Sequence, residues 1–226
     1  MGIEIPELPE LPELLTDDLE GCTTVYHGSF ECETEDIGIE DISNIDFDKL
    51  NKFTDFGWGF YLTDNKQQAE QWAKNVSKRK NGKLGIPSSS KIPKSVYKIK
   101  TVEWVPVMIS YPFNFEKNKY QIKTFSSPDE EWLRFIFMNR KYEPEVDYEV
   151  CRHSYEIVYG YVADGHFREI GNHFKKDFGD LTQEIKKKIL NVFLAKGTNS
   201  YKQISLHSVE VVNRILQDGE KQAIQD

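Results

Sequence analysis

Three short stretches of the sequence hold residue types that could bind a small organic molecule. They are YHGS at 26–29, FGWGFYLT at 56–63 and KQIS at 202–205. Each is expected along a β-strand or at its end, where a rigid backbone fixes the direction of its side chains. The chemistry that these stretches could support is therefore the starting point for function.

The residue types in the three stretches match the parts of one ligand. His27 offers an imidazole donor, and Gly28 offers an unobstructed backbone N–H and C=O, which suit a ribose hydroxyl and a primary carboxamide. Tyr61 and Trp72 lie eleven positions apart and could stack on both faces of a flat, cationic pyridinium ring. Gln203 could hydrogen-bond a second ribose. Carboxamide, pyridinium and ribose together form the nicotinamide riboside end of NAD.

Each of these residues also has a purely structural interpretation. A single histidine after a strand is usually a satisfied structural residue. Tyr61 in an apolar strand and Trp72 on the apolar face of a helix are typical core positions. The Gly-x-Gly at 57–59 can be explained by a turn before a strand. The order and spacing of the whole set favour a binding site more than any single member does.

With these motifs in place, the chain resembles the ADP-ribosyltransferase superfamily, in the branch of diphtheria toxin and the poly-ADP-ribose polymerases. That branch has a His-Tyr-Glu triad on three strands and a second aromatic residue at the spacing of Trp72. The chain is also similar to a bacterial family of small ADP-ribosyltransferase-like proteins, through DFGWGFYLT, WLRFIFMNR, EIVYGYVADG and QISLHS. The resemblance covers residues 24 to about 216. It implies an α+β fold: a split β-sandwich of two mostly antiparallel sheets with flanking helices and NAD in the cleft.

The resemblance also implies a role for each matching residue. His27 would hold a ribose hydroxyl, and Gly28 would bind the nicotinamide amide through its backbone. Tyr61 and Trp72 would enclose the nicotinamide ring, with Gly59 beside it. Gln203 stands where the branch has its catalytic glutamate, so the expected catalytic set is Gln203, His27 and Tyr61.

The sequence departs from the branch at two positions. Ala69 replaces a serine that often contacts the nicotinamide amide, which leaves that contact to Gly28 or Ser29. Gln203 keeps a hydrogen bond but loses the negative charge that stabilises an oxocarbenium-like transition state. Chain-extending polymerisation is therefore not expected, and Gln203→Glu is expected to raise NAD hydrolysis if the missing carboxylate limits the chemistry.

Four further residues are candidates for accessory roles in the site. Asn139 and Arg140 end the WLRFIFMNR segment, and the acids Glu156 and Asp164 flank an apolar strand. A surface or capping role is the structural alternative for both acids. No metal is expected, because the nicotinamide leaving group is already cationic and departs neutral.

These residues lead to an expected enzyme, a mono-ADP-ribosyltransferase. It would transfer ADP-ribose from NAD to a macromolecular acceptor, with a protein favoured over a nucleic acid. By analogy with similar small proteins, it would be a toxin held by an antitoxin, or an effector delivered into a target cell. The alternatives are an NAD glycohydrolase, a binding module for NAD or ADP-ribose that has lost catalysis, and a purely structural interaction protein.

Composition is typical of a soluble globular protein. The 226 residues are 38% hydrophobic and 13% aromatic, and the mean hydropathy is −0.59. No apolar run approaches the ~20 residues of a spanning helix, and the N-terminus lacks a signal-like start, so we expect a cytoplasmic protein without a membrane partner. The net charge of −8 disfavours non-specific binding to nucleic acid. The three cysteines have no paired spacing that would indicate a zinc site or disulfides.

The chain divides into a tail at 1–21 and a catalytic domain at 22–226. The tail repeats Pro-Glu-Leu with a period of three, as polyproline II does. It is expected to be a solvated tail or a docking strip for an antitoxin or another partner. In the domain, strands are expected at 23–27, where Gly28 ends the strand, at 59–62, in two runs near Pro106, at 155–162 with a bend or bulge at Gly160, and at 201–208. Helices are expected after caps at Asp64, Ser127 and Ser208, with one more helix ending at Gly197.

Overall fold

The computed structural model describes residues 19, 21–32, 43, 45–51, 54–83, 104–140, 153–163, 170, 173, 176–194 and 201–224. The Pro-Glu-Leu repeat, Asp164 and Gly197 lie outside these residues, so the predictions made for them stay predictions.

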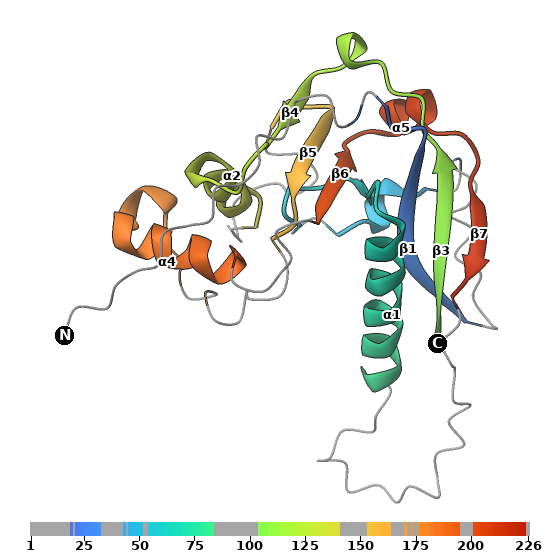
Figure 1. Ribbon diagram of the computed structural model, residues 1–226, viewed down its shortest axis with the longest axis horizontal. Helices are drawn as coiled ribbons and strands as arrows, with labels where there is room; N and C mark the ends of the chain where they lie inside the picture. Colours follow the sequence, from blue (N-terminus) through green and yellow to red (C-terminus); the bar gives the residue numbers. More distant parts are fainter. Residues whose placement is uncertain are drawn as a thin grey trace, which may run out of the picture.

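The described residues form two β-sheets that are split from each other along most of their length (Figure 1). The three-stranded sheet has the order β1 (Thr24–Cys32), β3 (Trp104–Pro112) and β7 (Glu220–Ala223). The four-stranded sheet has the order β2 (Phe60–Leu62), β6 (Lys202–Leu206), β5 (Ile157–Tyr161) and β4 (Ile122–Thr124). Every pairing is antiparallel except β4 with β5. The prediction of an α+β fold with two mostly antiparallel sheets is confirmed.

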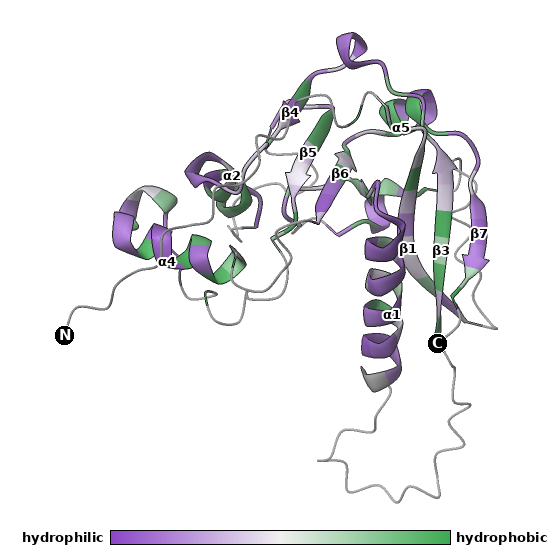
Figure 2. Ribbon diagram, in the orientation of Figure 1, coloured by the Kyte–Doolittle hydropathy of each residue, from purple (hydrophilic) through white to green (hydrophobic). Residues whose placement is uncertain are grey.

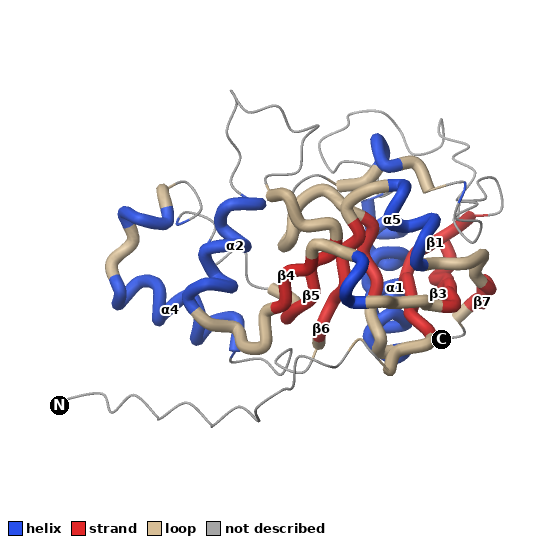
Figure 3. The backbone as a smooth tube through the Cα atoms, turned by 90° about the horizontal axis from the view of Figure 1, so that it is seen from above, coloured by secondary structure: helices blue, strands red, loops and turns tan. Residues whose placement is uncertain are grey.

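Helices flank the two sheets on different sides. They are α1 (Lys66–Lys83), α2 (Glu130–Arg140), α4 (Gln183–Leu194) and α5 (Val209–Ile215), with 3-10 turns η2 (Phe47–Lys49), η4 (Lys117–Lys119) and η6 (Phe178–Asp180). The long helix α1 packs along β1 and β3, whereas α2 and α4 lie together at the far side of the four-stranded sheet (Figures 1 and 3). None of the helices in the described ranges combines the length and apolar character needed to cross a membrane.

Two apolar cores follow from the alternation of side chains along the strands. On β6, Ile204 and Leu206 face the core between the two sheets, together with Val25 and Ile109 of the other sheet. The opposite face of the four-stranded sheet covers a second core, shared with α2 and α4 and centred on aromatic residues such as Trp132. Figure 2 shows apolar stretches on β3 and β5 and on parts of α2, α4 and α5, whereas α1 and β7 are mostly hydrophilic.

Several predicted boundaries differ from the structure for local reasons. β1 runs through Gly28 to Cys32, because the pairing with β3 continues past the glycine. The cap of α1 is Asn65, whose Oδ1 accepts from the N–H of Gln68 at 3.1 Å, and not Asp64. Gly160 forms no bulge, because it pairs in register with Gln203.

The predicted N-terminal cap is wrong for α2 and correct for α5. α2 begins after Asp129, whose Oδ1 accepts from the N–H of Trp132 at 2.9 Å, and so the capping box expected from Ser127 is wrong. The predicted cap of α5 at Ser208 is confirmed, because its Oγ accepts from the N–H of Val211 at 3.2 Å.

Candidate functional site

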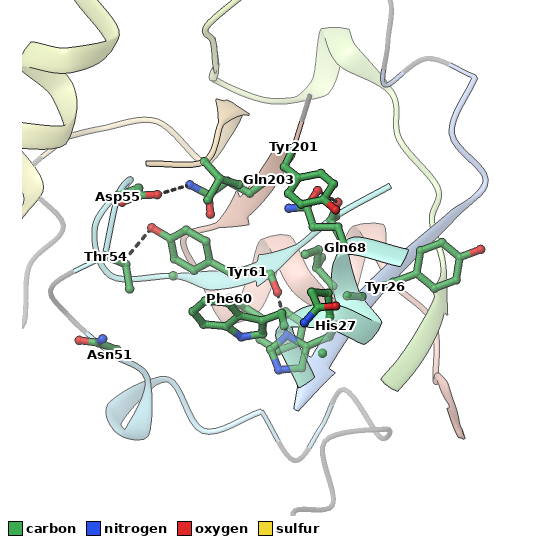
Figure 4. A pocket seen from close by; sticks show the side chains of 18 of the residues that line it. Tyr26, His27, Asn51, Thr54, Asp55, Phe60, Tyr61, Gln68, Tyr201 and Gln203 are labelled. Carbon is green, nitrogen blue, oxygen red and sulfur yellow. Dashed lines mark hydrogen bonds between the residues drawn. The ribbon is translucent and has the colours of Figure 1, made fainter. Parts of the chain in front are cut away.

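A cavity of about 470 Å³ opens where the two sheets part. β1 and β2 are joined at one bridge, in which Tyr26 and Thr63 exchange backbone hydrogen bonds of 2.8 and 3.0 Å. Beyond that bridge the strands separate, and α1 together with Leu50, Asn51, Thr54 and Asp55 completes the walls. The three stretches selected from the sequence therefore meet at one cavity (Figure 4).

His27 reaches the cavity from β1 as a neutral ring. Its Nδ1 lies 2.7 Å from the carbonyl oxygen of Tyr61, and its ring stacks on Phe60 with centroids 4.7 Å apart. A carbonyl oxygen can only accept, so Nδ1 carries the proton. Burial lowers the pKa of His27, which keeps the ring neutral near pH 7. Nε2 is then an acceptor, whereas a donor was expected from the sequence.

Gly28 presents its backbone to the cavity and is also required by packing. Tyr26 bonds Thr63 on the side away from β3, and backbone groups alternate in direction along an antiparallel strand. The N–H and C=O of Gly28, two residues further on, therefore point toward the side of the cavity. A Cβ built on Gly28 would lie 2.1 Å from the carbonyl oxygen of Ala69, so the close approach of α1 demands glycine whatever the ligand.

Tyr61 is held rigidly by its hydroxyl group. The hydroxyl accepts from the N–H of Phe56 at 2.8 Å and from the hydroxyl of Thr54 at 2.7 Å, and donates to the carbonyl oxygen of Gly57 at 2.8 Å. Burial raises its pKa well above the ordinary value, so Tyr61 stays neutral. One ring face packs against Phe56 at a centroid distance of 6.4 Å. The side chain can therefore contribute a ring surface but no acid–base chemistry.

Trp72 faces the cavity from α1 and is 42% exposed, which is unusual for a large aromatic residue. The guanidinium of Arg79 lies 5.1 Å from the centre of its ring. Trp72 and Tyr61 line the same cavity, and the described residues contain no ring pair between them. The interpretation of Trp72 as a core residue is therefore wrong.

Gln203 is bound to a carboxylate that the sequence did not single out. Its Nε2 donates to Oδ2 of Asp55 at 2.8 Å, and the N–H of Ala163 donates to the same oxygen at 2.9 Å. Nε and a terminal nitrogen of Arg140 lie 2.7 and 2.5 Å from Oδ1. The side chain of Asp55 is 4% exposed and that of Arg140 is 26% exposed. Asp55, Arg140 and Gln203 all line the cavity.

The other predicted site residues divide into those that line the cavity and those that do not. Gly59 lines it, and a Cβ there would lie 2.9 Å from the ring of His207. Ser29 does not line it, although its neighbours His27 and Gly28 do, so its expected role as an amide ligand is not supported. Glu156 accepts from the N–H of Gln121 at 2.8 Å and also lies outside the cavity.

Asn139 lies outside the cavity as well. It donates from Nδ2 to the carbonyl oxygen of Phe135 at 2.9 Å within α2, and it is buried. Of the accessory residues expected from the sequence and described in the structure, only Arg140 reaches the cavity.

A pair of neutral histidines supports the strand behind Tyr61. His207 donates from Nδ1 to the carbonyl oxygen of Trp58 at 2.7 Å, and its Nε2 accepts from the hydroxyl of Ser205 at 2.5 Å. Burial is the main cause that lowers the pKa of His207 to about 3, and nearby His153 adds to it. Ser205 is fully buried, so this hydroxyl–imidazole pair is a structural support and not an exposed nucleophile.

The sequence carried only a weak signal for Asp55. It is the first residue of DFGWGFYLT and precedes the Gly-x-Gly at 57–59, and aspartate is common beside such turns. Its partners lie 85, 108 and 148 positions away in the chain, so no local pattern links them. In the described part of the chain, no group of three or more His, Cys, Asp or Glu side chains could hold a metal ion.

Comparison with known proteins gives one match. A family model described as a protein of unknown function (DUF3990) matches residues 23–217. Searches of curated proteins and of solved structures find no match. The matched range covers most of the chain and every residue that lines the cavity. The chain therefore belongs to the DUF3990 family of proteins of unknown function.

Proposed function

We propose that the protein binds NAD in this cavity and transfers its ADP-ribose group to a macromolecular acceptor. The observation that carries the proposal is the convergence of His27, Gly28, Tyr61, Trp72 and Gln203 on one cavity from β1, β2, α1 and β6. A neutral imidazole acceptor, a free backbone edge, two aromatic rings and an amide oxygen match a sugar hydroxyl, a carboxamide, a flat ring and a second sugar. This agrees with the resemblance to ADP-ribosyltransferases.

In the proposed reaction, the nicotinamide ring lies between Tyr61 and Trp72. The bond between its ring nitrogen and C1′ of the ribose breaks, and nicotinamide leaves with the bonding electrons as a neutral molecule. Positive charge then builds on the ribose, and a nucleophile of the acceptor forms a new bond at C1′. The proton of that nucleophile goes to a base on the acceptor or to water, because the Gln203 amide cannot take it.

A second candidate function is binding of NAD or ADP-ribose without transfer. Asp55 is the only carboxylate among the described residues that line the cavity, and its charge is already paired with Arg140. A site with no unpaired carboxylate has a weak stabiliser for an oxocarbenium ion. Water in place of the macromolecular acceptor would make the protein an NAD glycohydrolase.

Incubation of the protein with NAD labelled in its adenylate half, in the presence of cell lysate, separates these functions. Label on a macromolecule together with free nicotinamide supports transfer. Free nicotinamide without label indicates hydrolysis, and calorimetric binding without either product indicates a binding module. Wild-type protein that is folded yet binds no NAD contradicts all three.

A matched pair of variants on β1 tests the placement of the ligand. His27→Ala removes the imidazole that lines the cavity, and we expect NAD affinity to fall at least about tenfold, the effect of losing one hydrogen bond. Ser29→Ala removes a hydroxyl two residues away that does not line the cavity, and we expect no change. Equal loss in both variants would indicate damage to β1. Melting curves show whether each variant is folded.

A further inference from the structure

The Gln203 amide can lie in only one orientation in this structure. Oδ2 of Asp55 is a carboxylate oxygen and can only accept, so the group of Gln203 that lies 2.8 Å from it must be the NH₂. The amide oxygen is therefore turned away from Asp55. Figure 4 shows the nitrogen of Gln203 directed at Asp55 and the oxygen on the other side of the amide group, above Tyr61.

Asp55 itself is fixed by Arg140, which also lines the cavity, and by a backbone group outside it. Arg140 binds Oδ1 through two nitrogens, and the N–H of Ala163 binds Oδ2. These bonds leave one lone pair of Oδ2 available, and it accepts the hydrogen bond from the Gln203 NH₂. A buried carboxylate with four such donors has a single stable orientation, since rotation would leave donors unpaired.

We propose that Asp55 is the positioning residue of the site: it holds the Gln203 amide with its oxygen toward the cavity, as an acceptor for a sugar hydroxyl. Gln203 then offers the ligand the same acceptor atom that a glutamate would, without the charge. The negative charge is instead on Asp55, which lies behind the Gln203 amide and is paired with Arg140. This inference rests on the proposed function for the identity of the ligand, but the orientation of the amide can be tested without any ligand.

The pair also changes what a glutamate at position 203 would do. Gln203→Glu would place two carboxylates in direct contact, which raises the pKa of the new side chain so that it keeps its proton at neutral pH. The protonated acid would donate to Asp55 and present a carbonyl oxygen to the cavity, as the amide does. We therefore expect Gln203→Glu alone not to raise NAD hydrolysis, in contrast to the increase expected from the sequence.

The orientation of the amide can be tested by exchanging the carboxylate of Asp55 and the amide of Gln203. In Asp55→Asn, the new amide keeps its oxygen on Arg140 and turns NH₂ toward Gln203, so the Gln203 amide reverses and presents a donor to the cavity. We expect NAD turnover (kcat/KM) to fall about ten- to a hundredfold, the effect of losing a positioned acceptor. Asp55→Asn with Gln203→Glu restores an acceptor, now ionised, and turnover should recover to the wild-type value or above it.

Two readouts do not depend on NAD. First, in the wild type the Gln203 side-chain amide protons and the Ala163 N–H converge on one oxygen, so they should give a nuclear Overhauser contact, which Asp55→Asn should abolish. Second, the raised pKa of the glutamate in Gln203→Glu stabilises the fold at low pH only. Its melting temperature relative to wild type should therefore fall as pH rises from about 5 to 8, and the double variant should lose this dependence.

Glu156→Gln is the matched control, because it also neutralises a carboxylate that accepts from a backbone N–H, but outside the cavity. It should change neither the Overhauser contact nor turnover. The proposal is overturned if the contact is absent in wild type or survives in Asp55→Asn, or if the double variant is no better than Asp55→Asn in a folded protein. If the wild type shows the contact and Gln203→Glu shows the pH dependence, but the folded wild type does not bind NAD, the positioning is supported and the proposed function is contradicted.

Discussion

The two walls of the cavity are built by different forces. The β1–α1 wall, formed by His27, Gly28, Ala69 and Trp72, is held by backbone geometry: a ladder with β3 on one side and a helix in van der Waals contact on the other. The Gln203 wall, formed by Asp55, Arg140 and Gln203, is held by charged hydrogen bonds between side chains from distant segments. The first wall is specified by steric fit and the second by electrostatic pairing.

The β1–α1 wall therefore determines the shape of the site, and the Gln203 wall determines its polarity. The β1–α1 wall offers a ring face, a backbone edge and a neutral imidazole, none of which changes protonation near pH 7. The Gln203 wall sets the polarity of the group that would meet developing positive charge. Variants on the first wall should therefore affect the fold, NAD binding or both, whereas variants on the second should also affect turnover.

The largest effect on stability is expected at the Gln203 wall, from Asp55→Ala. The change leaves Arg140 without its main partner and two buried donors unpaired, and it should lower the free energy of unfolding by about 3–4 kcal/mol. Urea denaturation at pH 7 measures this. Glu131→Ala, which removes a 67% exposed carboxylate that pairs with Lys123, should cost less than about 0.5 kcal/mol. Similar values for both would mean that the Asp55 network contributes little.

The next effect tests the steric origin of the β1–α1 wall. Gly28→Ala places a methyl group 2.1 Å from the backbone of Ala69, so α1 must move away from β1. We expect a loss of about 2–3 kcal/mol in the free energy of unfolding, together with weaker NAD binding. Gly179→Ala meets nothing within 4 Å and is the matched control. A Gly28→Ala protein as stable as wild type would show that the helix has room to shift.

A third prediction concerns acid and the buried His207, which supports the strand behind Tyr61. The pKa of His207 is lowered to about 3 in the folded protein, whereas it is about 6.5 in an unfolded chain. The unfolded chain therefore binds the proton first, and stability falls as pH drops below about 6.5. Between pH 6.5 and 5.0 this single histidine should cost about 2 kcal/mol.

His207→Gln removes that titration. Its amide can still donate to the carbonyl oxygen of Trp58 and accept from the hydroxyl of Ser205, as the imidazole does. Between pH 6.5 and 5.0, the free energy of unfolding should fall by about 2 kcal/mol less in this variant than in the wild type. An unchanged dependence on pH would assign the acid sensitivity to other groups.

The contrast between the walls also explains what the sequence could predict. His27, Gly28, Tyr61 and Trp72 follow from local patterns: an alternating strand, a glycine beside it, and an aromatic residue at helical spacing. The two mostly antiparallel sheets were implied by the family resemblance, whereas the local patterns predicted only a mixture of strands and helices. Asp55 could not be found in this way, because its significance lies in partners that only the folded chain brings together. The end of β1 was misjudged because glycine was read as a strand breaker, whereas it is a point of close packing.

Trp72→Ala is expected to have the smallest effect on the fold, so its effect on NAD binding is not confounded by a loss of stability. Because the side chain is 42% exposed, its removal should change the free energy of unfolding by less than about 0.5 kcal/mol. Loss of one stacking face should weaken NAD binding by about 1 kcal/mol, or about fivefold, measured by calorimetry. Trp72→Tyr keeps a ring at this position and should restore most of the affinity, while Gln67→Ala, an exposed position on the same helix outside the cavity, should have no effect. If Trp72→Ala bound NAD as wild type does, the ligand would not lie against α1, and the β1–α1 wall would be a structural surface only.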